Sequence, residues 1–192
     1  MGVLQLFVPD RCLSSFADVT PSFLQENGIA ALACDIDNTL VTYDDAVPTE
    51  AVLHWLETLV SAGISVGFLS NNHLQRVERF CQDLPVKLFA APDAKKPSCK
   101  ALYRFLQDAH VTPKQTAVLG DQIFTDVLMA KRLGCRAFLV PPIQDRTDWF
   151  HRSKRRGERP FLRRYCRQMR RSGLLAPSDN PFCNIKQDDN QM

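Results

Sequence analysis

Residues 29–39 read Ile-Ala-Ala-Leu-Ala-Cys-Asp-Ile-Asp-Asn-Thr, and this stretch decides the fold that the sequence predicts. Residues 29–34 are continuously apolar, which is typical of a strand buried on both faces of a parallel sheet. Two aspartates, Asp35 and Asp37, follow immediately. They are expected at the carboxyl edge of the sheet, which is where open α/β folds bind their ligands.

Four more apolar runs of strand length follow this stretch, at 64–69, 86–90, 116–119 and 136–140. Helical apolar spacing fills the intervals between them, at 49–62, 72–84, 97–110 and 125–133. Pro97 is expected in the first turn of its helix, where a missing N–H costs nothing. The alternation predicts a Rossmann-like three-layer α/β sandwich with a five-stranded, mainly parallel sheet.

The 192 residues divide by composition into four segments. Residues 1–27 form an N-terminal arm, and residues 28–143 form the α/β domain. Residues 144–175 are predicted to be a basic helical extension. Residues 176–192, rich in Pro, Ser, Asp, Asn and Gln, are predicted to be a disordered tail.

Three of the expected strands end in a polar residue, namely Asp35, Ser70 and Asp121. Each alone would be read as a cap or turn residue. Together, at successive strand ends, they are expected to converge on one crevice. One carboxylate of the Asp35 and Asp37 pair can attack an electrophile while the other serves as acid and base. Carboxylates from two strand ends also form an oxygen-rich site that suits Mg²⁺.

These segments resemble the haloacid dehalogenase-like phosphatases. The runs that carry the resemblance are Asp-Ile-Asp-Asn-Thr-Leu-Val at 35–41, Ser-Asn-Asn at 70–72, Ala-Lys-Lys-Pro at 94–97 and Gly-Asp-Gln-Ile-Phe-Thr-Asp at 120–126. The combination is similar to the YqeG branch and to mitochondrial phosphatidylglycerophosphatases. The gap after the first of these runs holds only a flap, and the gap after the second holds only one helix and one strand. The resemblance therefore implies an uncapped, open crevice.

The resemblance implies a role for each residue. Asp35 would be the nucleophile that forms an aspartyl-phosphate, and Asp37 the general acid and base. The phosphate-binding residues would be Ser70, Asn71 and Lys96, with Lys95 a competitor for Lys96. The Mg²⁺ ligands would be Asp35, the backbone carbonyl of Asp37, and Asp121, with Asp126 acting from behind them.

The net charge of +3 is unevenly distributed along the chain. Residues 1–150 carry 13 Lys and Arg against 17 Asp and Glu, whereas residues 151–171 carry ten against a single glutamate. Pro160 is expected to split this basic segment. Beyond it, apolar residues share one helical face, and the arginines lie elsewhere on the helix, at Arg163, Arg164, Arg167, Arg170 and Arg171.

This pattern is open to three interpretations. The helix can lie in the headgroup region of an anionic membrane, or pack on the domain with its arginines in water. Nucleic-acid binding ranks third, because no recognised nucleic-acid motif accompanies the arginines.

The sequence therefore predicts a Mg²⁺-dependent phosphomonoesterase acting on phosphatidylglycerophosphate. The alternatives are the same chemistry on a soluble sugar or nucleotide phosphate, and a non-catalytic RNA-binding module. The first residues lack the pattern of a signal peptide, and no apolar run reaches the roughly 20 residues of a membrane span. We expect a cytoplasmic protein, peripheral on the inner face of a membrane.

Overall fold

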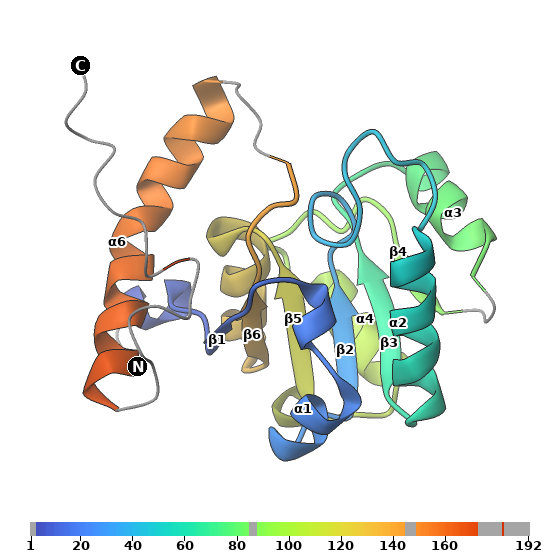
Figure 1. Ribbon diagram of the computed structural model, residues 1–192, viewed down its shortest axis with the longest axis horizontal. Coiled ribbons are helices and arrows are strands. Elements are labelled where there is room, and N and C mark those ends of the chain that lie inside the picture. The colour runs from blue at the N-terminus through green and yellow to red at the C-terminus, as the bar shows by residue number, and fades with distance from the viewer. Residues whose placement is uncertain (1–2, 85–87, 145–148, 173–181, 183–192) are drawn as a thin grey trace.

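The computed structural model describes residues 3–84, 88–144, 149–172 and 182, with the backbone alone for 149–155. One fully parallel sheet organises the described residues, in the order β1-β6-β5-β2-β3-β4 (Figure 1). The strands are β1 (Arg11–Cys12), β2 (Ala31–Cys34), β3 (Ser65–Leu69), β4 (Phe89–Ala91), β5 (Thr116–Gly120) and β6 (Arg136–Leu139). The predicted α/β class and parallel sheet are confirmed.

The sheet has six strands in the described residues, whereas the sequence predicted five. The extra strand, β1, belongs to the N-terminal arm and pairs with β6, Arg11 lying opposite Phe138. A strand of two residues is too short to show an alternating pattern, so it could not be predicted from the sequence. Asp10 fixes the pairing, because its carboxylate accepts the backbone N–H of Ala137 at 2.8 Å and binds Lys131 Nζ at 2.7 Å.

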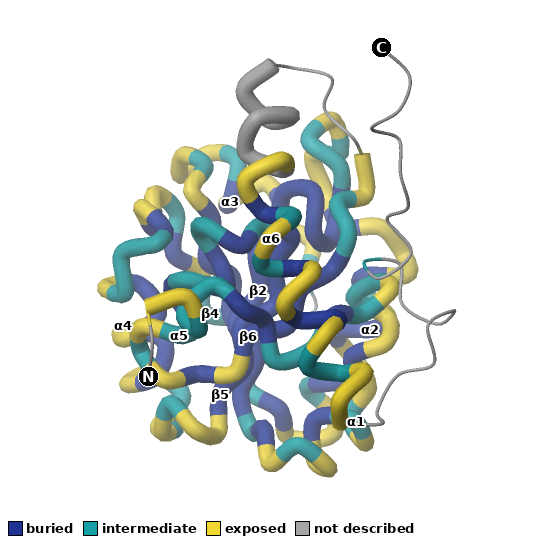
Figure 2. The backbone as a smooth tube through the Cα atoms, turned by 90° about the vertical axis from the view of Figure 1, so that its left-hand side faces the viewer, coloured by how far each residue is buried: buried dark blue, intermediate teal, exposed yellow. Residues whose placement is uncertain are grey.

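Helices cover both faces of the sheet and make the three-layer sandwich (Figures 1 and 2). One face carries α1 (Pro21–Glu26), α2 (Glu50–Ser61) and α3 (Leu74–Gln82). The other carries α4 (Lys100–Asp108), α5 (Leu128–Leu133) and α6 (Trp149–Arg171). Short 3₁₀ turns complete the described elements at η1 (Val3–Phe7), η2 (Phe16–Asp18) and η3 (Pro113–Gln115), and a π-helical turn lies at η4 (Ile123–Val127).

Strand β2 shows why the sheet is buried on both sides. Ala31 and Ala33 face the α4 side, whereas Leu32 and Cys34 face the α2 side, and all four are fully buried. The run of apolar residues therefore supplies both cores at once, as a central parallel strand requires. Figure 2 shows the strands as the buried centre of the molecule.

Two local predictions differ from the structure. Pro97 was placed in the first turn of its helix, but α4 begins at Lys100, so Pro97 belongs to the preceding loop. This loop presents Lys96, whose Nζ pairs with Asp35 and Asp126 at the sheet edge. Of the strand predicted at 86–90, only the end is described, as β4, because residues 85–87 lie outside the described residues.

Helix α6 runs unbroken through Pro160, which was expected to split it. Its apolar stripe packs on the domain: Leu162, Tyr165 and Cys166 are buried, and the Tyr165 hydroxyl accepts the backbone N–H of Cys12 at 3.1 Å. The packing interpretation of this stripe is therefore correct. The predicted tail, 176–192, lies outside the described residues except for Phe182.

The segment between β2 and β3 contains a loop, residues 39–49, and α2, all of it described. We call this loop the flap. Between β3 and β4 the described residues form α3. Neither described segment holds a cap domain, which confirms the uncapped architecture. None of the described helices is both long and apolar enough to cross a membrane.

Candidate active site

The predicted residues meet at the carboxyl ends of three adjacent strands. Asp35 directly follows β2, Ser70 follows β3, and Asp121 follows β5. Cys34 of β2 lies opposite Phe68 of β3 on one side and opposite Leu119 of β5 on the other, so the three strand ends are level. Together they bound a cavity of about 220 Å³, lined by Asp35, Asp37, Tyr43, Ser70, Asn71, Asn72, Lys96, Gln122 and Thr125.

Lys96 lies at the centre of the buried charges. Its Nζ donates to Asp35 Oδ1 and pairs with Asp126 Oδ1 at 2.7 Å. Burial alone would lower the pKa of Lys96, but the carboxylates of Asp126 and Asp35 outweigh it and raise that pKa. The ammonium therefore keeps its charge. Lys95, the competitor in the sequence, is exposed, whereas Lys96 lines the cavity.

The backbone of Lys96 is held by Asn71. The Asn71 side-chain oxygen accepts the Lys96 N–H at 2.7 Å, and its amide nitrogen donates to the Lys96 carbonyl at 3.3 Å. Asn71 was predicted to bind phosphate. In the structure it lines the cavity and fixes the loop that presents the lysine.

Asp35 is buried in a position where its charge is costly. Burial raises the pKa of its carboxyl to about 6, against the opposing effect of Lys96 and with a further contribution from Asp126. Its second oxygen, Oδ2, accepts a hydrogen bond from the Thr39 hydroxyl at 3.3 Å. One oxygen thus faces the lysine while the other is fixed from the flap side.

Asp37 is held by a residue that the sequence analysis missed, Arg76 of α3. Its guanidinium places Nε at 3.0 Å and Nη2 at 2.9 Å from Asp37 Oδ1, and Nη1 donates to the Ala46 carbonyl in the flap at 3.0 Å. Ser70 Oγ donates to the other oxygen, Asp37 Oδ2, at 3.3 Å. Arg76 occupies an ordinary helix position, so only its proximity to the aspartate reveals it.

The turn η4 aims Asp126 at the cavity. Asp126 Oδ2 accepts the Gln122 backbone N–H at 3.3 Å and the Thr125 hydroxyl at 3.1 Å, which leaves Oδ1 for Lys96. Gly120 makes room for it, since a Cβ at position 120 would come within 2.5 Å of Asp126 Cβ. Gly120 at the end of β5 is thus a steric requirement of this carboxylate.

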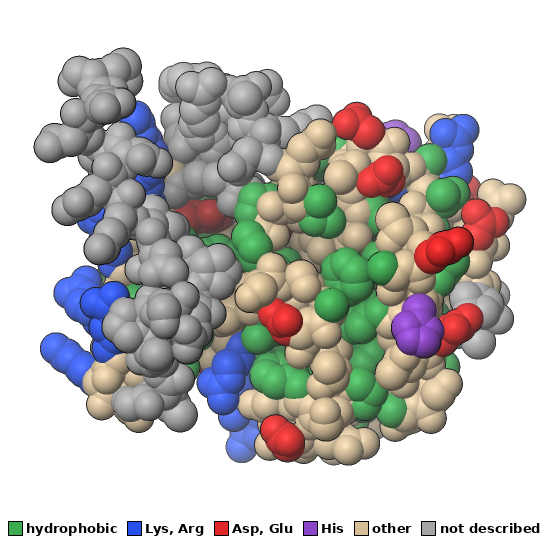
Figure 3. All heavy atoms as spheres, in the orientation of Figure 1, with side chains coloured by type: hydrophobic (Ala, Val, Ile, Leu, Met, Phe, Trp, Pro, Cys, Tyr) green, Lys and Arg blue, Asp and Glu red, His purple; other side chains and the backbone are tan. Residues whose placement is uncertain are grey.

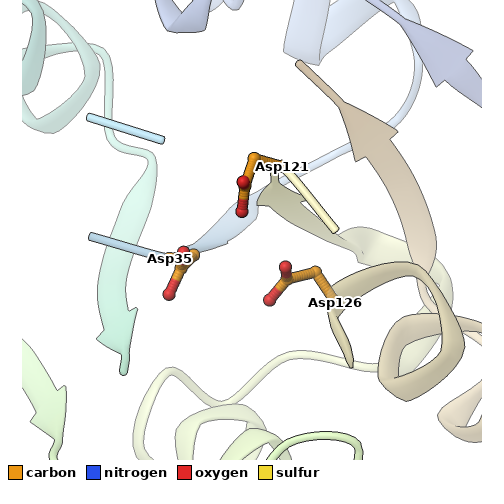
Figure 4. Close-up of side chains that lie close together, drawn as sticks. All are labelled: Asp35, Asp121 and Asp126. Carbon is orange, nitrogen blue, oxygen red and sulfur yellow. The ribbon is translucent and has the colours of Figure 1, made fainter. Parts of the chain in front are cut away.

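Three buried carboxylates form a group that could hold a metal ion. Asp35, Asp121 and Asp126 each offer an oxygen, and these oxygens lie within 4.8 Å of one another (Figure 4). With Asp37 they make four carboxylates, against the cations Lys96 and Arg76, a formal charge of −2. Hard oxygen donors with an excess charge of −2 fit a divalent cation such as Mg²⁺.

Helix α6 reaches the same turn from the other side. Glu158, the single acid of the basic segment, is buried and accepts the Ile123 backbone N–H at 2.8 Å. Phe161 packs on Phe7 and Phe124, with ring centroids 4.9 and 6.0 Å away. Glu158 was not predicted as a functional residue either, although a lone glutamate among ten basic residues is a visible signal.

The five predicted arginines are exposed on the outer side of α6. In Figure 3, Lys and Arg side chains gather along the side of the molecule that α6 forms. Their end of the helix lies level with α1, whereas the helix begins near the loops above the sheet (Figure 1). The arginines therefore lie along the side of the sheet and do not join the cavity.

A parallel sheet whose carboxyl edge holds two neighbouring aspartates beside a buried lysine is the arrangement of haloacid dehalogenase-like phosphatases, the predicted class. The sequence comparisons confirm it. The family model described as mitochondrial PGP phosphatase matches residues 3–144. The chain belongs to this family and is a phosphatase.

Two curated relatives are similar over most of the chain. The probable phosphatase YqeG of Bacillus subtilis (strain 168) is 32% identical over 158 residues, 82% of this chain and 91% of its own. The mitochondrial phosphatidylglycerophosphatase GEP4 of Saccharomyces cerevisiae is 30% identical over 146 residues, 67% of this chain and 77% of its own. These matches confirm the predicted YqeG branch.

Solved structures are similar at lower identity. A cobalt-bound deoxy-D-mannose-octulosonate 8-phosphate phosphatase from Haemophilus influenzae is 20% identical with a TM-score of 0.49, covering 74% of this chain and 92% of its own. An enzyme from Bacteroides thetaiotaomicron, in complex with magnesium and inorganic phosphate, is 14% identical with a TM-score of 0.47, covering 62% and 98%. The family assignment rests on the sequence matches alone.

Proposed function

We propose that the protein is a Mg²⁺-dependent phosphatidylglycerophosphatase, which removes the terminal phosphate of phosphatidylglycerophosphate and leaves phosphatidylglycerol. The observation that carries the chemistry is the convergence of Asp35, Asp37, Ser70 and Lys96 on one cavity. The lipid substrate is supported by the name of the yeast relative and by the uncapped crevice. A site without a cap leaves room for a headgroup that is still attached to its lipid.

The two aspartates divide the reaction between them. In the first half, a carboxylate oxygen of Asp35 attacks phosphorus while the bond to the leaving oxygen breaks. Asp37 gives that oxygen a proton, so that the alcohol departs neutral. In the second half, Asp37 takes a proton from water, the water oxygen attacks phosphorus, and Asp35 is released with inorganic phosphate.

Lys96 and Ser70 hold the phosphoryl oxygens during both halves, as preorganised donors at a phosphoryl-transfer site do. Asn71 positions Lys96 for this task through its two backbone hydrogen bonds. Mg²⁺ would be held by Asp35, the Asp37 backbone carbonyl and Asp121, with Asp126 supporting them. When bound, the ion would neutralise charge between a negatively charged phosphate and the carboxylates.

The test is phosphate release from phosphatidylglycerophosphate in mixed micelles with Mg²⁺, beside the Asp35→Asn variant. We expect release by the wild type and a loss of roughly 10⁴-fold or more in the variant. Hydrolysis of a small ester such as p-nitrophenyl phosphate, without lipid turnover, would retain the mechanism and refute the lipid substrate. An inactive wild type that binds RNA in a salt-dependent way would support the non-catalytic alternative.

We also propose that the arginines of α6 bind an anionic membrane from the cytoplasmic side. The support is that Arg163, Arg167 and Arg170 are exposed while the apolar stripe beside them is already buried. Their contact would be with lipid phosphates, at about 1 kcal/mol for each arginine near the surface. The apolar face of α6, which one interpretation of the sequence placed in the headgroup region, is buried against the domain and is not available to the membrane.

The membrane proposal is tested by substitution. Removing α6 would expose the core beneath Leu162, so the triple variant R163Q/R167Q/R170Q is the appropriate change. Sedimentation with phosphatidylglycerol vesicles should show a loss of binding of roughly 100-fold. Equal sedimentation of both proteins would refute the proposal, and neutral vesicles are the control.

A further inference from the structure

A second hollow opens beside the catalytic cavity, between the flap and helix α3. Its volume is about 600 Å³, and it is lined by Tyr43, Asp44, Ala46, His73, Gln75, Arg76, Glu78, Arg79 and Gln82. Tyr43 lines the catalytic cavity as well, so the two spaces adjoin at this side chain. We call this space the flap–α3 hollow.

The direction in which the leaving group departs follows from Asp37. A general acid must lie within hydrogen-bond reach of the oxygen that it protonates. Asp37 Oδ1 faces the guanidinium of Arg76, and Arg76 lines the flap–α3 hollow. Asp37 and Tyr43 both line the catalytic cavity, so an alcohol released at Asp37 lies in the space from which the hollow opens past Tyr43.

The cations of this hollow have different duties. The guanidinium of Arg76 is largely occupied by contacts within the protein, since it binds Asp37 and the Ala46 carbonyl. Arg79 comes three residues later on α3, which places the two side chains on the same face of the helix. Arg79 is exposed and forms no ion pair with the described residues. It is the cation that remains for a ligand.

We propose that the flap–α3 hollow binds the leaving group of the substrate and that Arg79 recognises a second phosphate on that leaving group. The inference rests on the proposed phosphatase mechanism, because Asp37 defines the side of departure. The chemical class is a phosphomonoester whose alcohol carries another phosphate or phosphodiester a few bonds away. A guanidinium suits this task because its N–H groups match phosphate oxygens in pairs.

The experiment measures binding, so that it does not depend on turnover. Isothermal titration calorimetry with Mg²⁺ compares two probes on the Asp35→Asn background, glycerol 1,3-bisphosphate and glycerol 3-phosphate. The probes differ only in the second phosphate. We expect the bisphosphate to bind more tightly, and Arg79→Gln to weaken it about fivefold relative to the monophosphate. Arg79→Glu should weaken it further.

Two more variants sharpen the test. Glu78→Gln removes an anion that lines the hollow and should tighten bisphosphate binding about twofold. Arg104→Gln is the matched control, because Arg104 is exposed on α4, on the opposite face of the sheet. It should leave the ratio of the two dissociation constants unchanged. Arg76 is not substituted, because it contacts Asp37.

The inference would be overturned if the two probes bound equally or if neither bound. It would also be overturned if Arg79→Gln left the ratio of the two dissociation constants unchanged. None of these results depends on lipid turnover, which the micelle assay measures separately. An Arg79-dependent preference without hydrolysis of phosphatidylglycerophosphate would retain the hollow and reject the lipid. If the lipid were hydrolysed but Arg79→Gln left the ratio of the two dissociation constants unchanged, the role of the hollow would be rejected and the proposed function retained.

Discussion

The carboxyl edge of the sheet and the outer face of α6 are two charged regions of the molecule, and charge is placed in opposite ways in them. At the edge, Asp35, Lys96 and Asp126 are buried, and Lys96 pairs with both carboxylates. On α6, arginines such as Arg163 and Arg167 stand in water. Buried charges must be paired with great care, whereas exposed ones add little to stability. Charged side chains therefore have different consequences for stability in the two regions.

The largest effect should come from removing the buried cation. Lys96→Met leaves Asp35, Asp121 and Asp126 together without their lysine, and the free energy of unfolding in metal-free buffer should fall by about 3–5 kcal/mol. Mg²⁺ should restore part of the loss. Urea unfolding measures both. Lys95→Met, an exposed neighbour, is the control, with a change below about 0.5 kcal/mol. Equal stability of the two variants would contradict the charge balance described for the edge.

The pH dependence of stability should report Asp35. Burial raises the pKa of this carboxyl to about 6, so the folded protein holds its proton more tightly than the unfolded chain does. Asp35 therefore adds stability below about pH 4 that is lost as the pH rises through about 6, in all about 3 kcal/mol. Asp35→Asn lacks this titration. The free energy of unfolding of both proteins should be measured without metal from about pH 4 to pH 7. As the pH rises, the variant should become increasingly stable relative to the wild type. A constant difference between the two would refute the raised pKa of Asp35.

One substitution made in both regions should give unequal results. Gly120→Ala forces a Cβ against Asp126 and should destabilise the protein by about 2 kcal/mol. Gly157→Ala on α6 meets only the ring edge of Phe124, at 3.3 Å, and gains about 1 kcal/mol in helix propensity. Its net change should stay below about 1 kcal/mol. Thermal unfolding ranks the two, and a G157A protein as unstable as G120A would break the comparison.

The smallest effect belongs to the arginines themselves. Replacing Arg163, Arg167 and Arg170 by Gln should change the free energy of unfolding by at most about 1 kcal/mol in total, because each side chain is exposed. Leu162→Ala, a buried neighbour on the same helix, should cost about 2–5 kcal/mol and shows that the assay detects damage to α6. A comparable loss in the triple variant would mean that the arginines hold the helix in place.

The sequence predicted the strand ends well because polar residues after apolar runs are a local signal. Asp35, Ser70 and Asp121 all lie where this signal placed them. Arg76 and Glu158 escaped it, since their roles depend on contacts across 39 and 35 residues of chain. Strand β1 was not predicted because two residues are too few to show a periodic pattern. The continuity of α6 was not predicted because local rules treat a proline as a helix break, whereas the packed helix tolerates it.

Strand β1 has a consequence for the order in which the protein is made. It leaves the ribosome early, yet Asp10 beside it must wait for Ala137, 127 residues later, before the pair can form. At about 5–20 residues per second, that interval is roughly 6–25 seconds. Strands β2 and β3 can meet long before then. Strand β1 precedes the other described strands in sequence and is the last that can join the sheet, because synthesis of β6 sets the earliest moment at which that edge is closed.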